Sequence, residues 1–343
     1  MTLRATVLVV PMRFVPYHHL DGQPHVVVDG GPTDGTRLTL SHWPGSPTPV
    51  DLLDDLSAQI AFRALDRPGL LDGIDIVSNN HLDQDGLVSA YALIDPAAAN
   101  ERREFAIDVA RAGDFATFVD RASMRIAFAL AAWADGERSP LDPAIFEGGY
   151  EDECGHLYEE ILPRMSELLD APEALRPWWE AEDAHLTESL DAIDAGVVTI
   201  EERPDLDLAV VTVPEAWAAR MTTRFTINRS EAVHPAAINA RTDRLRVATV
   251  QGARYRVECR YETWVMFRSR PVMGRPDLRP LAMRLQAVEA GTAVWHADAP
   301  GALTPALTIT AGASALEPAH FVAEVTAQLA DAPVAWDPMR PMA

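Results

Sequence analysis

The sequence contains no lysine, so all 29 of its basic residues are arginines, and 51 acidic residues give it a formal net charge of -22. Such a charge argues against a protein that coats nucleic acid in general, because that function needs a basic surface. Cysteine is nearly absent: Cys154 and Cys259 lie far apart and form neither a disulfide framework nor a zinc-binding pattern. No apolar run approaches the ~18 to 20 residues of a membrane-spanning helix, which argues against a membrane protein.

What the chain does have is enough material for a large core. Its 343 residues, 48% of them hydrophobic, are typical of a globular protein with two domains. Near the N-terminus an apolar segment, 5–12, is followed by Arg13 without a small-residue cleavage site. This predicts a strand and not a signal peptide. We therefore expect a cytoplasmic protein.

Charge is distributed unevenly along the chain. Residues 135–195 include 18 acidic and 3 basic residues, whereas residues 236–284 include 11 basic and 4 acidic residues. The pattern also changes from helical to β near residue 196. The arginine-rich part suits a small anionic ligand, and a homodimer is compatible with this composition. We predict three parts: a first domain over 1–135, an acidic helical segment over 136–196 that links or completes it, and a C-terminal substrate-binding domain over 197–343.

Expected strands and helices alternate through the first half. The predicted strands are 25–28, 37–43, 74–77 and 105–109, and the predicted helices are 51–65, 87–94 and 118–133. This alternation predicts an α/β fold with a doubly wound, mainly parallel sheet. The acidic segment is then a helical insertion, and the second half forms a smaller α+β domain, with strands that include 254–267.

The stretch 74–94 carries the clearest chemical signal. It reads as a buried strand, a polar loop with His81, Asp83 and Asp85, and a helix. Open α/β sheets place their chemistry at the carboxyl ends of such strands, and Gly86 would allow a sharp turn there. Imidazole and carboxylate ligands at alternate positions suit Mn²⁺ or Mg²⁺. The alternative is an acidic turn that caps the helix.

Polar residues also follow the other expected strands. Asp29, His42 and Asp108 lie where strands end, and Asp114 follows shortly after Asp108. If the strands are parallel neighbours, these groups meet the His81 loop at one sheet edge. They could then hold one metal ion, or two ions that share one carboxylate. Each has a plainer alternative: Asp29 as a turn former, His42 as a core histidine, and Asp108 as a cap for the following loop.

HLDQDGLVSA resembles the first motif of the DHH phosphoesterase superfamily, His-x-Asp-x-Asp-Gly-x-x-Ser-Ala. The phrases SHWPGSPTP and SNNHLDQDGL are similar to those of an uncharacterised branch. The resemblance implies a phosphoester hydrolase in which His81, Asp83 and Asp85 bind Mn²⁺ or Mg²⁺ and activated water attacks a phosphodiester or nucleotide-like substrate. The alternative is a catalytically degenerate protein that binds nucleotide or phosphate.

A phrase in the second half, WVMFRSRPVMGRPDLRPLAMRL, resembles the core of the DHH-associated C-terminal domain. In that domain an Arg-Ser pair ends a strand, and the arginine holds the substrate's phosphate. The resemblance therefore implies a substrate site at Arg268 and Ser269, to which we add Arg270 because a guanidinium fits phosphate geometry. The alternative is that the arginines lie on an edge strand without contacting a ligand.

Two motifs of the superfamily are missing. The chain has no Asp-His-His triplet, and EAGTAVWH stands where Gly-Gly-Gly-His would be, leaving Gly291 and His296. The triplet supplies a metal ligand, so a second ion would need Asp108 or His42 instead.

The acidic segment also contains two Glu-x-x-His pairs, Glu153 with His156 and Glu182 with His185. This spacing is that of di-iron helical bundles. Such bundles need four long helices, and prolines interrupt the segment, so a solvated acidic face is the favoured interpretation.

Overall fold

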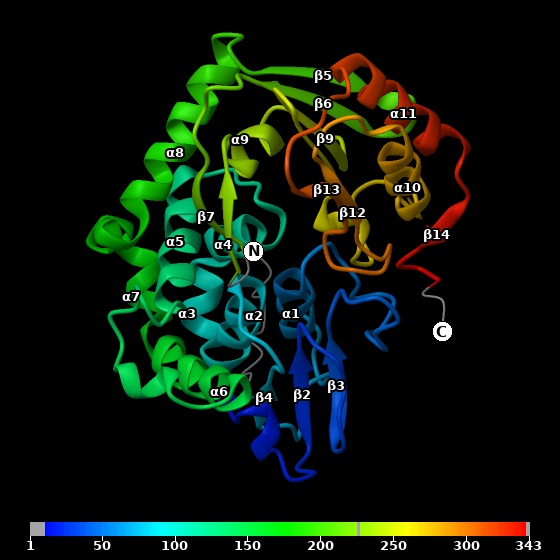
Figure 1. Ribbon diagram of the computed structural model, residues 1–343. Helices are drawn as coiled ribbons and strands as arrows, with labels where there is room; N and C mark the ends of the chain where they lie inside the picture. The colour runs from blue at the N-terminus through cyan, green and yellow to red at the C-terminus, as the bar shows by residue number, and fades with distance from the viewer. Residues whose placement is uncertain (1–10, 225–226, 341–343) are drawn as a thin grey trace, which may run out of the picture. The chain divides into compact units, whose positions relative to one another are not determined.

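The computed structural model describes residues 11–224 and 227–340, and it has a mixed α/β fold (Figure 1). The chain divides into two compact units, Met1–Glu180 with Thr223–Ile227, and Ala181–Thr222 with Asn228–Ala343. The acidic segment is thus shared between them. The predicted strand 5–12 falls almost entirely outside the described residues.

The first unit contains a four-stranded sheet in which all described pairings are parallel, as predicted. Its order is β1 (Arg13–Phe14), β4 (Ile76–Ser78), β2 (His25–Val28) and β3 (Thr36–Leu40). Every residue of β2 and β4 is buried, which explains why both segments are apolar without alternation. Because the strands are parallel, the chain leaves β2, β3 and β4 at the same edge of the sheet.

Helices make up most of the rest of the first unit. They are α1 (Ser57–Leu65), α2 (Gln84–Ile94), α3 (Pro96–Glu101), α4 (Arg103–Phe115), α5 (Arg121–Trp133), α6 (Tyr150–Ile161), α7 (Met165–Asp170) and the start of α8 (Arg176–Asp194). The short 3-10 helices of this unit are η1 (Tyr17–His19), η2 (Pro143–Phe146), η3 (Leu162–Arg164) and η4 (Pro172–Leu175). Two more, η5 (Pro204–Leu206) and η6 (Tyr261–Thr263), lie in the second unit. The helix α2, which carries the motif, packs against α1 and α4.

The predicted strand 105–109 is wrong, because these residues lie inside α4. A short apolar run has no period of its own that separates a buried strand from a buried helix. The continuation decides the matter: Ala106, Ala110 and Gly113 are buried at helical spacing.

The second unit is built on a six-stranded sheet of order β12-β13-β10-β9-β6-β5. Its strands are β5 (Thr199–Arg203), β6 (Leu208–Val213), β9 (Arg246–Gln251), β10 (Arg254–Cys259), β12 (Val294–Ala297) and β13 (Ala306–Ala311). The pair β6 and β9 is parallel and the other described pairs are antiparallel. The core of this unit includes three stacked aromatic rings, those of Tyr255, Trp295 and Phe321. The helices α10 (Arg279–Val288) and α11 (Pro318–Asp331) contribute to the same core, and Phe321 comes from α11.

The smaller elements are α9 (Pro235–Asn239) and two strand pairs, β7 (Arg220–Arg224) with β8 (Ile227–Glu231) and β11 (Arg275–Pro276) with β14 (Val334–Trp336). The predicted strand 254–267 ends early, at Cys259, and the chain continues through η6. Arg268 therefore follows an irregular segment and not a strand.

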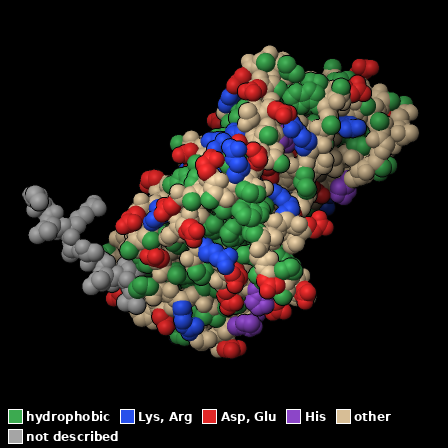
Figure 2. All heavy atoms as spheres, turned by 90° about the vertical axis from the view of Figure 1, so that its left-hand side faces the viewer, with side chains coloured by type: hydrophobic (Ala, Val, Ile, Leu, Met, Phe, Trp, Pro, Cys, Tyr) green, Lys and Arg blue, Asp and Glu red, His purple; other side chains and the backbone are tan. Residues whose placement is uncertain are grey.

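Acidic and arginine side chains are interspersed on the surface that Figure 2 shows. Ion pairs of exposed side chains in the first unit include Arg164 with Glu160, at 2.9 Å, and Arg176 with Glu180, at 3.3 Å. No described helix combines the length and the apolarity that a bilayer crossing requires.

Candidate metal centre

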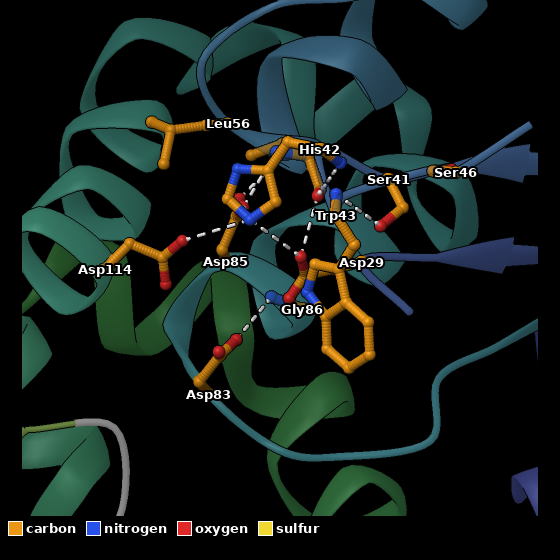
Figure 3. A network of polar contacts seen from close by, with 12 residues as sticks. Asp29, Ser41, His42, Trp43, Ser46, Leu56, Asp83, Asp85, Gly86 and Asp114 are labelled. Carbon is orange, nitrogen blue, oxygen red and sulfur yellow. Dashed lines mark hydrogen bonds and ion pairs between the residues drawn. The ribbon is translucent and has the colours of Figure 1, made fainter. Parts of the chain in front are cut away.

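The loops that leave the parallel sheet bring acidic and histidine side chains together (Figure 3). Among the described residues, two groups of three have ligand atoms close enough to hold a metal ion: Asp29, His42 and Asp85, and Asp29, His81 and Asp83. Five of the six residues that we predicted as metal ligands therefore meet. The two groups share Asp29.

Asp29 is placed to serve both groups. It follows β2 with a left-handed backbone, φ 44°, a conformation that Asp tolerates better than most residues, and its N–H donates to the Leu40 carbonyl at 2.9 Å. One oxygen, Oδ1, lies 3.4 Å from His42 Nε2, and the other, Oδ2, lies 3.3 Å from His81 Nε2. A carboxylate with this orientation can bridge two ions.

A backbone carbonyl orients the His42 ring. Its Nδ1 lies 2.6 Å from the carbonyl oxygen of Asp55, which only accepts, so Nδ1 carries the hydrogen. In the neutral ring Nε2 then has a lone pair, and this atom faces Asp29, Asp85 at 3.8 Å and Asp114 at 3.5 Å. A metal cation between this lone pair and the carboxylates would bind both, since each supplies electron pairs to a metal. The contacts are those expected of a metal-ligating histidine held by an outer partner.

Asp83 and Asp85 each cap a helix as well. Asp83 Oδ1 accepts from the Gly86 N–H at 2.8 Å, at the start of α2. Asp85 accepts at both oxygens from the first turn of α1, Ser57 N–H at 2.8 Å and Ala58 N–H at 2.7 Å. The capping that we considered as the alternative is thus present. It leaves Asp83 Oδ2 directed at His81, at 3.0 Å, and Asp85 Oδ2 facing His42.

Asp114 also faces the centre, as we expected of the polar groups that follow strands, although we did not choose it as a ligand. It comes from the last turn of α4 and is fully buried, yet neither of its carboxylate oxygens forms a hydrogen bond with any residue that the structure describes. An unsatisfied buried carboxylate is unusual, and a bound cation is one physical reason for it. Helical spacing from Ala110 would have placed Asp114 on the buried face.

Asp108, which we predicted as a ligand instead, lies outside both groups. Its carboxylate accepts from Ser123 Oγ at 2.5 Å, from the backbone N–H groups of Val119 and Asp120, and from Arg111 at 3.0 Å. These bonds hold the turn between α4 and α5. Its position is that of a loop cap, because the segment is a helix and not a strand that ends at the site.

The pKa values reflect the crowding of charge. Burial raises the pKa of Asp29, and the Asp83 carboxylate raises it further. Burial, with the neighbouring carboxylates, also raises the pKa of Asp85 and Asp114 well above the usual value. Burial opposes the charged form of His81, yet the Asp83 and Asp29 carboxylates raise its pKa well above the usual range. The field and hydrogen bond of His81 lower the pKa of Asp83 in spite of its burial.

Only one side of the centre reaches solvent. The His81 side chain is 21% exposed, whereas those of Asp29, His42 and Asp85 are at most 1% exposed. The Trp43 ring lies beside His81, with centroids 5.1 Å apart. A small molecule would therefore meet the centre at His81.

Gly86, at the start of α2, is closely packed against Asn79 and Tyr158. A Cβ on Gly86 would lie 2.3 Å from Asn79 Nδ2 and 2.4 Å from the Tyr158 hydroxyl, which are themselves joined by a hydrogen bond of 2.9 Å. Gly86 has no positive φ. The glycine is therefore required for close approach and not for the sharp turn that we expected.

The residues predicted for substrate binding lie in the second unit. Arg268, Ser269 and Arg270 share the irregular segment after η6. The Arg270 guanidinium donates to Asp207, at 3.2 and 3.4 Å, and to the Asp243 carbonyl. An arginine held in this way is less suited to bind phosphate.

Neither Glu-x-x-His pair belongs to a group of three ligands among the described residues. His156 is exposed, as a solvated face requires. The solvated-face interpretation is wrong for the second pair, because Glu182 and His185 are buried and Glu182 faces His234 at 3.5 Å.

Fold and site together define an α/β protein with a buried cluster of aspartates and histidines that could hold a metal ion. Over residues 10–340 the chain matches the model of a family of unknown function, DUF6687, and it belongs to that family. No curated protein and no solved structure matches it.

Proposed function

We propose that the protein is a metal-dependent phosphoesterase-type hydrolase that acts on a phosphodiester or nucleotide-like anionic substrate. The observation that carries this proposal is Asp29, whose two oxygens face His42 and His81 and so divide one carboxylate between two ligand groups. Shared carboxylates are a feature of two-metal sites for phosphoryl displacement. We also propose that the protein is related to the DHH phosphoesterases and that its parallel sheet is doubly wound.

The donor chemistry favours Mn²⁺ or Mg²⁺. All ligand atoms in the two groups are carboxylate oxygens or imidazole nitrogens, without a thiolate. Four buried carboxylates, those of Asp29, Asp83, Asp85 and Asp114, surround two histidines. Two divalent ions would balance four negative charges, and the raised pKa values of Asp29, Asp85 and Asp114 are consistent with negative charge that gains from a nearby cation or proton.

The residues take distinct roles in this proposal. When bound, the ions would supply an activated water and stabilise charge on the phosphoryl oxygens. Asp29 would be shared between the two ligand groups, His42 and Asp85 would hold the buried ion, and His81 with Asp83 would hold the ion nearer to solvent. Arg268 and Ser269 stay predicted phosphate contacts.

Elemental analysis of purified, unchelated protein tests the metal centre. We expect one to two equivalents of Mn²⁺ or a similar metal, reduced in His81→Ala and in Asp83→Ala. Asp108→Asn is the matched control, because it removes a buried aspartate that the structure places outside both groups. The absence of metal from wild-type protein, even after Mn²⁺ is supplied, would refute the proposal.

A metal-loaded protein is then assayed against phosphodiester and nucleotide substrates. Turnover that Asp85→Ala abolishes, in a protein that remains folded, supports hydrolysis. Tight nucleotide binding without turnover in any metal would instead favour the degenerate binding protein.

A further inference from the structure

A short segment from far along the chain belongs to the first unit. Residues Thr223–Ile227 group with it, although the residues on either side group with the second unit. Hydrogen bonds from two of its described residues attach the segment: Arg138 Nη1 donates to Thr223 Oγ1 at 3.0 Å, and Arg224 Nη2 donates to the backbone carbonyl of Asp114 at 2.6 Å. Arg224 is 9% exposed.

The carbonyl that Arg224 binds is at the end of a helix. Asp114 is the second-last residue of α4, and Ala116 turns the chain away with a left-handed φ of 48°. The last carbonyls of a helix lack partners within it, and the negative end of the helix dipole favours a cation. Arg224 supplies both a donor and a positive charge at this point.

The Asp114 carbonyl that Arg224 binds belongs to the same residue whose carboxylate faces the metal centre. The carboxylate forms no hydrogen bond with the described residues and faces His42 Nε2 at 3.5 Å. Its direction therefore depends on how the backbone of the last turn of α4 is held. Arg224 holds that backbone at Asp114 itself.

We propose that Arg224 is a positioning residue for the buried half of the metal centre: by binding the Asp114 carbonyl it aims the Asp114 carboxylate at the cation beside His42. The proposal rests on the metal centre proposed above and adds a support for the Asp114 carboxylate. Arg224 touches neither substrate nor metal in this role.

Metal titration of Arg224→Met, Arg224→Lys and Asp114→Asn tests the proposal, with Mn²⁺ binding followed by calorimetry. Loss of an outer partner typically weakens metal binding by about 10 to 100-fold. We expect a weakening of that size for one of two ions in Arg224→Met. Arg224→Lys should fall between Arg224→Met and the wild type, because an ammonium can still donate to the carbonyl.

The double variant Arg224→Met, Asp114→Asn separates positioning from a general effect on the fold. If Arg224 acts through Asp114, the double variant binds Mn²⁺ no more weakly than Asp114→Asn alone, because the two changes remove one interaction. Independent losses that add would overturn the proposal. Tighter binding in Arg224→Met would also overturn it, since the guanidinium would then act only by repelling the cation.

Arg220→Met is the matched control on the same strand. Arg220 pairs with Glu188 at 2.5 Å, and both side chains are largely exposed. This variant should bind both ions like the wild type. A wild-type protein without metal refutes the proposed function, whereas two ions bound equally well by wild type and Arg224→Met refute the role of Arg224 alone.

Discussion

The two units bury charge in different ways. In the second unit Arg260 is paired with Glu262, both nearly inaccessible, and Arg275 donates to Thr263 Oγ1 at 2.6 Å and to the Leu303 carbonyl at 2.8 Å. In the first unit four carboxylates meet two imidazoles, and Asp114 finds no hydrogen bond among the described residues. A buried charge with a counter-charge or a full set of hydrogen bonds supports the structure, whereas a buried carboxylate without a hydrogen bond is a candidate for binding a ligand.

The largest expected effect is at the shared carboxylate. Asp29→Asn removes a ligand from both groups, so we expect the loss of both ions, measured as metal content after dialysis. Asp21→Asn is the control, because Asp21 is another aspartate with a left-handed backbone, φ 47°, and it is exposed. If Asp29→Asn retained both ions, Asp29 would not be a shared ligand of the two groups.

The balanced pair of the second unit should respond in stability and not in metal binding. Glu262→Gln leaves the buried Arg260 without its counter-charge, which typically destabilises a protein by about 3 to 5 kcal/mol. Chemical denaturation measures this change, and calorimetry should find metal binding in the folded variant unaltered. A change in metal stoichiometry would show that the two kinds of cluster are not separate.

The imbalance also predicts how pH acts on metal-free protein. Asp29, Asp85 and Asp114 have raised pKa values in the folded state, so that state binds more protons than the unfolded chain. Stability should therefore fall as pH rises above about 4. His81, also raised, acts in the same direction above about 6.5, whereas the lowered pKa of Asp83 stabilises the fold above about 4 and opposes the trend only at the acidic end.

Thermal melting of chelated protein between pH 5 and 8 measures this dependence. The melting temperature should decrease toward pH 8, and Mn²⁺ should restore more of it at pH 8 than at pH 5, because the ion replaces protons. A melting temperature that rises with pH in chelated protein would contradict the predicted shifts.

The smallest effect concerns the aspartate that only looks like a ligand. Asp108→Asn weakens the hydrogen bonds that hold the turn between α4 and α5, and we expect a loss of about 1 to 3 kcal/mol in unfolding free energy. Metal content should be unchanged. Loss of an ion would place Asp108 in the centre after all.

Much of this centre follows from local pattern. The segments around β2, β3 and β4 read as buried strands, and parallel strands bring Asp29, His42 and the His81 loop to one edge. The prediction failed at residues 105–109, because five residues are too few to separate a strand period from a helical one. This segment is helical, so Asp108 lies outside the centre and Asp114, later in the same helix, faces it. The strand before Arg268 ended early for a similar reason, since alternation does not say where a strand stops.

Arg224 illustrates what local pattern cannot supply. It is separated from Asp114 by 110 positions and bonds to a backbone carbonyl, an acceptor that every residue carries. No spacing or residue type in the sequence marks such a contact. Only the folded chain, in which Thr223–Ile227 joins the first unit, places the two together.

The ring of Trp43 beside His81 has an optical consequence. With centroids 5.1 Å apart, the indole is close enough for a paramagnetic ion bound at His81 to quench its fluorescence. Mn²⁺ bound there should quench the fluorescence of Trp43, whereas Mg²⁺, which is diamagnetic, should leave it unchanged. The emission of this one tryptophan, obtained by subtracting that of Trp43→Phe, would thus report which ion occupies the solvent-facing half of the centre.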